Sequence, residues 1–148
     1  MLNRDDILDN LEKMIQLDVD ATHAYDQAIK NVNEQIIKDK LIQFQADHRK
    51  HIDLLSAKVL ELGGTPPELT SDFKGFMISG FTALRSLTGT KGALEAMETN
   101  ERLTNSRYEE VCKLDFPTDI LAILRSNWSD EQRHLAFIRE AIPTVGRT

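Results

Sequence analysis

Cysteine is nearly absent from this sequence of 148 residues, because Cys112 is the only one. A single thiol cannot form an internal disulfide, and it is more often a small buried apolar group than a nucleophile. Long apolar runs are also missing, since no stretch approaches the roughly 20 residues that a membrane-spanning helix needs. The segment Met1–Asn10 carries four charged residues where a signal peptide would be apolar. We therefore expect a cytoplasmic protein without a membrane segment.

Basic residues are not in excess either. The chain has 18 Lys and Arg against 24 Asp and Glu, which gives a formal net charge of -6. Binding to nucleic acid requires a concentrated patch of Lys and Arg, and the sequence contains none. Apolar residues make up 41% and charged residues 28%, as in ordinary globular proteins. The length fits one core, so we expect residues 1–148 to form a single domain.

Apolar residues recur at spacings of three and four, whereas the period-two alternation of strands is not sustained anywhere. This spacing predicts four helices of about 22 to 29 residues each, and therefore an all-α protein. Gly63-Gly64 and Asp115-Phe116-Pro117 are the expected stop signals of the second and third helices. The residues expected in the common core are Ile7, Leu11, Met14, Leu41, Phe44, Leu55, Met97, Tyr108, Leu124 and Ile138.

The connections predict the topology. Helices one and two, and helices three and four, are joined by only a few residues, so each pair should form an antiparallel hairpin. The link from Gly64 to Gly89 is long enough to return along the bundle, which would leave helices two and three parallel. Phenylalanine-rich residues within this link keep a helical spacing and suggest a short fifth helix. This helix would cap the bundle or, alternatively, form a homodimer surface or a cover over a site.

An internal repeat relates the two hairpins. A shift of 83 positions places identical residues on one another: Leu11 on Leu94, Met14 on Met97, Tyr25 on Tyr108, Ile37 on Ile120, Leu41 on Leu124, Asp47 on Asp130 and His51 on His134. The same shift places Asp18 on Glu101 and His48 on Glu131. Two like hairpins pack most simply about an approximate two-fold axis, so residues near the middle should face their counterparts.

Each predicted helix carries ionisable residues in its apolar stripe, at mid-length. They are Asp18, His48, His51, Glu101, Glu131 and His134. An unpaired buried charge costs several kcal/mol at least, so these groups must be paired or must bind a cation. A polar layer that fixes helix register is one explanation, and for any single residue it is the simpler one. Six such residues at matching heights on four helices favour a metal site.

At these residues the chain resembles the ferritin-like superfamily, in particular its rubrerythrin-like branch and an uncharacterised bacterial ferritin-like domain family. The resemblance implies a ferritin-like four-helix bundle in which helices one and three each supply a carboxylate, while helices two and four each supply Glu-x-x-His. Asp18 and Glu101 match the single carboxylates, and Glu131-Gln132-Arg133-His134 is a complete motif. Helix two departs from the pattern, because His48-Arg49-Lys50-His51 has histidine where a bridging glutamate is expected.

This departure removes one negative charge and one bridge. The three carboxylates do not neutralise two divalent ions, and neutral imidazole adds no charge. The site could therefore hold one metal, two metals with an exogenous bridge, or a nitrogen-preferring ion; we expect iron first, with manganese and zinc as alternatives. Tyr25 and Tyr108, each seven residues after a carboxylate, and Asp47 and Asp130, each preceding a motif, are expected to support the ligands.

Two functional hypotheses follow. In the first, implied by the resemblance, the bound metal reacts with oxygen or peroxide, and the protein is an oxidoreductase that acts in oxidative stress. The chain lacks the cysteines of a rubredoxin-type iron, so any electron donor would be a separate partner. In the second, the bundle is a non-catalytic structural or interaction protein whose polar layer holds structural metal or none.

Overall fold

The computed structural model describes residues 1–67 and 89–146, and within them it contains helices and no strand. Four long helices account for most of these residues: α1 (Arg4–Asn31), α2 (Gln35–Glu61), α4 (Gly89–Cys112) and α5 (Thr118–Ala141). A single 3-10 turn, η1 (Ile142–Thr144), follows α5. The all-α prediction is confirmed, and the helix lengths of 24 to 28 residues agree with the periodicity of the sequence.

Local signals in the sequence set the helix ends. The side chain of Asn3 accepts a hydrogen bond of 2.8 Å from the backbone N–H of Asp6, which caps the first turn of α1. Helix α2 stops before Gly63, whose φ of 80° lies in the left-handed region that favours glycine. The backbone N–H of Gly64 then donates to the carbonyl of Val59 at 2.9 Å, which completes this C-terminal turn.

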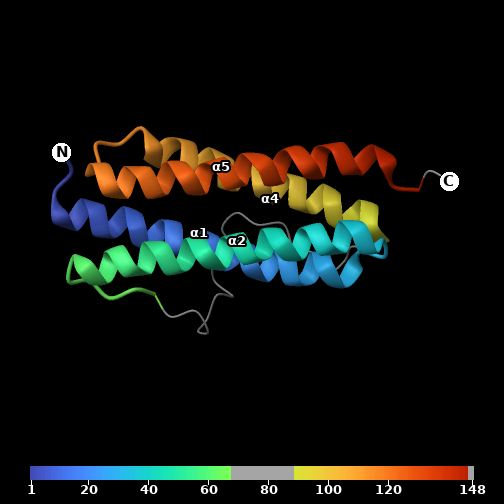
Figure 1. Cartoon of the computed structure of the whole chain (residues 1–148), viewed down its shortest axis with the longest axis horizontal. Helices are drawn as coiled ribbons and strands as arrows, with labels where there is room; N and C mark the ends of the chain where they lie inside the picture. The colour runs from blue at the N-terminus through green and yellow to red at the C-terminus, as the bar shows by residue number, and fades with distance from the viewer. Residues whose placement is uncertain (68–88, 147–148) are drawn as a thin grey trace.

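The helices form two antiparallel hairpins, α1–α2 and α4–α5, packed side by side (Figure 1). Helix α1 contacts α2 and α4, while α5 contacts α4 and α2, so α2 and α4 lie on a diagonal of the bundle. Helices α2 and α4 run in the same direction, because α2 ends at one end of the bundle and α4 begins at the other (Figure 1). The predicted parallel arrangement of these two helices is thus correct.

The apolar core consists of two clusters, one toward each end of the bundle. One cluster includes Ala28, Leu41 and Met97, and the other includes Leu11, Leu55 and Leu124. All ten residues expected in the core are buried. On α2, α4 and α5 the two clusters leave a gap at mid-length, which is where the ionisable residues of these stripes lie. On α1 Asp18 lies close to the point where one cluster ends and the other begins.

Two further expectations concern the rest of the chain. The fifth helix predicted between Gly64 and Gly89 falls almost entirely on residues 68–88, which lie outside the described residues. Among the helices that the structure describes, none combines the length and the apolar character required to cross a bilayer.

Candidate metal centre

The structure brings all six inward-facing ionisable residues together at mid-bundle. Asp18 lies on α1, His48 and His51 on α2, Glu101 on α4, and Glu131 and His134 on α5. None of the six is more than 1% exposed. Their side chains offer ligand atoms within 4.8 Å of one another in two overlapping groups: Asp18, His48, His51 and Glu131 form one, and His48, Glu101, Glu131 and His134 form the other.

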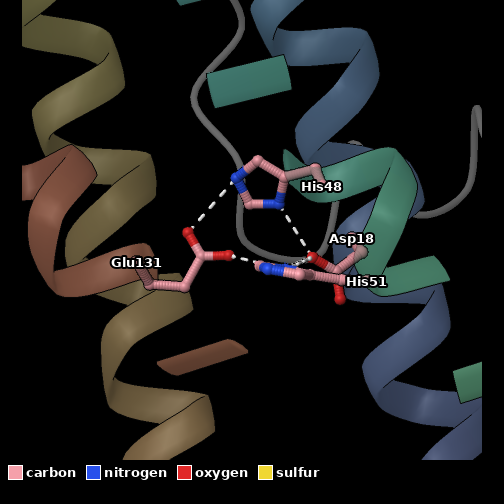
Figure 2. Close-up of side chains that lie close together, drawn as sticks. All are labelled: Asp18, His48, His51 and Glu131. Carbon is pink, nitrogen blue, oxygen red and sulfur yellow. Dashed lines mark hydrogen bonds and ion pairs between the residues drawn. The ribbon is translucent and has the colours of Figure 1, made fainter. Parts of the chain in front are cut away.

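Asp18 is the centre of the first group. Its Oδ1 accepts hydrogen bonds from Nδ1 of His48 at 2.8 Å and from Nδ1 of His51 at 3.2 Å. Figure 2 shows these two rings between Asp18 on one side and Glu131 on the other. The carboxylate of α1 thereby holds both histidines of α2, so the first hairpin alone supplies three of the four side chains.

The second group is built around Glu131. Its Oε2 lies 3.1 Å from Nδ1 of His134 and 3.2 Å from Nε2 of His48, and its Oε1 lies 3.3 Å from Nδ1 of His51. His48 Nε2 also donates to Oε1 of Glu101 at 3.2 Å. Glu131 Oε1 and Glu101 Oε2 are buried and accept no hydrogen bond of good geometry, although each forms a longer ion pair, with Nδ1 of His51 at 3.3 Å and with Nδ1 of His134 at 3.5 Å. Buried carboxylate oxygens without a hydrogen bond are costly, and such atoms are suited to bind a cation.

The outer nitrogens of His51 and His134 are held by aspartates of the opposite hairpin. Nε2 of His51 donates to Oδ2 of Asp130, and Nε2 of His134 donates to Oδ2 of Asp47, both at 2.8 Å. Arg133 donates to Asp47 at 3.1 Å and to Asp130 at 2.9 Å, so it joins the two aspartates at the surface. A carboxylate on the outer nitrogen fixes the orientation of a ligand histidine, and here it leaves each Nδ1 facing the centre.

Neighbouring carboxylates change the protonation of all three rings. Burial alone would lower the pKa of each histidine, but hydrogen bonds and charges from the surrounding carboxylates outweigh it. They raise the pKa of His51 to about 10, with Asp18 and Glu131 as the main partners. Asp47, Glu101 and Glu131 raise the pKa of His134 to about 10, and Glu131 with Asp18 and Glu101 raises the pKa of His48 well above its usual value. Without metal, the three rings are therefore cationic at neutral pH.

Glu131 shows the complementary shift. Burial would raise the pKa of this carboxyl group, but the charge of His48 and the close ring nitrogens of His134, His48 and His51 hold it well below the usual range. The centre thus contains ionised carboxylate among imidazolium rings. A divalent cation could replace the ring protons, because the donor set is the one that carboxylate–histidine metal sites use. On this ground the residues present fit a divalent metal.

Both tyrosines bond to the single carboxylates of the opposite hairpin. The hydroxyl of Tyr25 donates to Oε1 of Glu101 at 3.0 Å, and that of Tyr108 donates to Oδ2 of Asp18 at 2.5 Å. Tyr108 also accepts a hydrogen bond from Nδ2 of Asn127 at 3.3 Å. Burial and the adjacent carboxylate charges raise the pKa of both phenols well above the usual value, so both stay protonated. Each tyrosine hydroxyl therefore orients one carboxylate of the cluster through a hydrogen bond.

Replacing Tyr108 with phenylalanine should lower the free energy of unfolding by about 1–3 kcal/mol in metal-free protein. The change leaves Oδ2 of Asp18 and the amide of Asn127, both buried, without this partner. The matched variant Tyr25→Phe loses one hydrogen bond rather than two and should cost less. Urea unfolding in the presence of chelator measures both. A loss below about 0.5 kcal/mol for Tyr108→Phe would mean that the hydroxyl does not support Asp18.

Sequence reasoning missed one buried carboxylate, Asp20. This side chain is only 4% exposed, and its Oδ1 accepts no hydrogen bond. Burial raises its pKa to about 7. Asp20 does not belong to either ligand group, and nothing in the apolar period of α1 marks it, since it lies two residues from the inward-facing Asp18.

Replacing Asp20 with asparagine should stabilise the protein at pH 8 and have little effect at pH 4. The pKa of the folded state is raised from 3.8 to about 7, so folding favours the protonated acid, and this advantage is lost as pH rises through 7. Asparagine does not ionise, and the expected gain at pH 8 is about 1–3 kcal/mol. Exposed Asp53→Asn is the control. Equal effects of Asp20→Asn at the two pH values would contradict the raised pKa.

A family model matches residues 6–114, which include α2, α4 and all of α1 except its first two residues; its description is "Domain of unknown function (DUF2383)". The chain belongs to this family. Four of the six clustered residues, Asp18, His48, His51 and Glu101, fall inside the matched range, whereas Glu131 and His134 on α5 lie beyond it. No curated protein matches the sequence.

Solved structures identify the fold as ferritin-like. The bacterioferritin-related protein of Bacteroides fragilis, a dodecameric thioferritin, superposes with a TM-score of 0.84 over 99% of this chain and 89% of its own, at 17% identity. A ferritin-like, diiron-carboxylate protein from Bacillus anthracis str. Ames gives 0.75 over 96% and 99%, at 19% identity. Dps from Thermosynechococcus elongatus gives 0.79 over 93% and 90%, at 15% identity. Such low identities establish the fold alone, and they confirm the predicted ferritin-like four-helix bundle.

Proposed function

We propose that this protein is a metal-binding bundle in which Asp18, His48, His51, Glu101, Glu131 and His134 bind divalent metal. The observation that carries the proposal is the pair of overlapping ligand groups, contributed by four helices and buried at mid-bundle. Two buried carboxylate oxygens in the cluster have only long ion pairs and no hydrogen bond of good geometry, which supports the same conclusion. Asp47 and Asp130 would orient the histidines, and Tyr25 and Tyr108 would orient the carboxylates.

Iron is the first candidate, with manganese and zinc as alternatives. Mixed imidazole and carboxylate ligands suit all three metals, and the three histidines shift the preference away from magnesium and calcium. Iron in this position would supply electrons to oxygen or peroxide, as expected of an oxidoreductase of the rubrerythrin-like branch. The protein residues would then exclude water from the centre, hold the ligands and keep both phenolic protons adjacent to ligand carboxylates. An oxidative-stress role, with a separate protein as electron donor, belongs to this proposal.

Metal retention tests the proposal. The protein would be purified without chelator or affinity-tag nickel, exposed in turn to iron(II) under nitrogen, manganese(II) and zinc(II), and analysed for bound metal after gel filtration. At least one ion per chain should remain on the unmodified protein and none on Glu131→Ala/His134→Ala. The matched control, Glu110→Ala/His23→Ala, removes the same residue types away from the cluster and should retain metal. Failure of the unmodified protein to keep any of the three ions refutes the proposal.

A non-catalytic bundle is the second candidate function. The ring-to-carboxylate hydrogen bonds form a buried layer without metal, and such a layer can fix helix register. Iron(II) oxidation distinguishes the two functions. A redox protein should oxidise bound iron(II) with oxygen or peroxide faster than iron in buffer, and this difference should vanish in Glu131→Ala/His134→Ala. A structural bundle gives no such difference.

Residues 1–148 are proposed to act as one domain in the cytoplasm, without nucleic-acid or membrane partners. Self-association, with a homodimer as the simplest form, is also proposed; the B. fragilis neighbour is itself described as dodecameric.

A further inference from the structure

His48 and Glu131 belong to both ligand groups, whereas the other four residues belong to one group each. The first group is completed by Asp18 and His51 of hairpin α1–α2. The second is completed by Glu101 and His134 of hairpin α4–α5. Each group therefore contains one carboxylate and one histidine of its own, together with the same two shared residues.

The repeat explains this division. Shifting the sequence by 83 positions relates Asp18 to Glu101 and His51 to His134. The two residues that belong only to the first group are therefore the counterparts of the two that belong only to the second. The same shift relates His48 to Glu131. The two shared residues thus occupy one pair of equivalent positions in the repeat, and each belongs to both groups.

The two nitrogens of His48 face different groups. Nδ1 lies 2.8 Å from Oδ1 of Asp18 in the first group, and Nε2 lies 3.2 Å from Oε1 of Glu101 in the second. Glu131 is divided in the same way, since Oε1 lies 3.3 Å from His51 and Oε2 lies 3.1 Å from His134. Figure 2 shows Glu131 directed toward both His48 and His51 through separate oxygens.

We infer that His48 bridges two metal ions, one on each ring nitrogen, and that Glu131 forms the second bridge between the same ions. The inference rests on the proposed metal-binding function. His48 thus takes the place of a bridging carboxylate, rather than leaving the bridge to an exogenous anion. Each ion receives two nitrogens and two oxygens: Asp18, His51, His48 and Glu131 for one, and Glu101, His134, His48 and Glu131 for the other.

Charge balance supports the bridge. Two divalent ions bring four positive charges, and Asp18, Glu101 and Glu131 provide three negative ones. A ring that coordinates through both nitrogens has lost every N–H proton to solvent, and it supplies the fourth negative charge. His51 and His134 remain neutral, since each keeps its Nε2–H on an aspartate. The buried centre is then electrically neutral, as a site without access to counter-ions should be.

The bridge fixes the distance between the ions. Metal–nitrogen bonds of about 2.0 Å on opposite sides of one imidazole place the ions about 6 Å apart. Two-metal sites that have only carboxylate or oxygen bridges, with no bridging imidazole, have ions about 3.5–4 Å apart instead. In this centre His48 would set the longer separation, and Glu131 would place one oxygen on each ion. The number of bound ions and their separation are therefore independent readouts of the role of His48.

Zinc binding to the full chain tests the inference. Bound zinc would be counted by elemental analysis, and the zinc–zinc distance would be measured by X-ray absorption at the zinc edge and in zinc-loaded crystals. Unmodified protein should hold two ions about 6 Å apart. His48→Gln, which offers one metal-binding atom instead of two opposed nitrogens, should hold one ion or none. The control His23→Gln, a histidine outside both groups, should still hold two.

The variant His48→Glu provides a second, positive readout. It restores Glu-x-x-His on α2 and should again hold two ions, now about 3.5–4 Å apart. Two ions about 4 Å apart in unmodified protein, or two ions retained by His48→Gln, would overturn the bridge while leaving metal binding intact. A single bound ion in unmodified protein would likewise overturn the bridge and leave metal binding intact. Complete absence of bound zinc, iron and manganese would overturn the proposed function as well. If His48→Gln does not fold, the zinc–zinc distance in unmodified protein is sufficient to test whether His48 bridges the two ions.

Discussion

Replacing Glu131 with alanine is expected to lower the free energy of unfolding of metal-free protein by about 3–5 kcal/mol. Glu131 lies within 3.3 Å of a ring nitrogen on each of the three histidines, and all four side chains are buried. Its removal leaves cationic rings with fewer negative partners in an interior that cannot solvate them. This is a large fraction of the 5–15 kcal/mol that stabilises an ordinary domain.

Urea unfolding at pH 7 with chelator measures this loss. Glu110→Ala is the matched control, because Glu110 lies on an exposed face of α4, and it should change stability by no more than about 0.5 kcal/mol. A loss under about 1 kcal/mol for Glu131→Ala would show that the rings are neutral and that the buried ionic network does not exist in solution.

Metal affinity is expected to keep rising with pH well above neutrality, by at least tenfold per pH unit between pH 7 and 9. The ring pKa values are raised, to about 10 for His51 and His134, so every ring carries a proton that metal must displace throughout this range. Binding that releases protons strengthens as pH rises, and the slope of log affinity against pH equals the number released. One displaced proton per ring would give about a thousandfold per unit in overall affinity, and the second proton that a bridging His48 loses would raise this to about ten-thousandfold.

Chelator-buffered zinc titrations at a series of pH values measure the slope. Calorimetry in two buffers of different ionisation enthalpy counts the released protons independently. Histidines with the ordinary pKa near 6.5 would be neutral above pH 7.5, and the affinity would then be flat. A flat profile from pH 7.5 to 9 would therefore contradict the raised ring pKa values.

The four-helix architecture could be predicted from the sequence, because both the apolar stripes and the repeat are visible as regular spacings of residues along the chain. Leu11, Leu41 and Leu124 could be assigned to a core from period alone, and the offset of 83 correctly paired the hairpins. The long link also predicted that α2 and α4 are parallel, since a chain must return along the bundle before a second like hairpin can begin.

Side-chain contacts between the two hairpins could not be predicted from residue spacing. The sequence marked Asp47 and Asp130 as neighbours of the motif histidines, but each aspartate bonds to the histidine of the other hairpin. That exchange depends on the angle and separation of α2 and α5, which no periodicity encodes. The burial of Asp20 was missed for a similar reason, because an outward position on one helix becomes buried only through packing against other parts of the chain.

Anomalous diffraction from crystals soaked in zinc or manganese tests the metal centre most directly. Data collected on both sides of the absorption edge locate the metal without reference to the protein density. Anomalous peaks are expected at mid-bundle, within coordinating distance of Asp18, His51 and His48 on one side and of Glu101, His134 and His48 on the other. Peaks found only at the surface, with the buried rings still hydrogen-bonded to the carboxylates, would contradict the proposed metal centre.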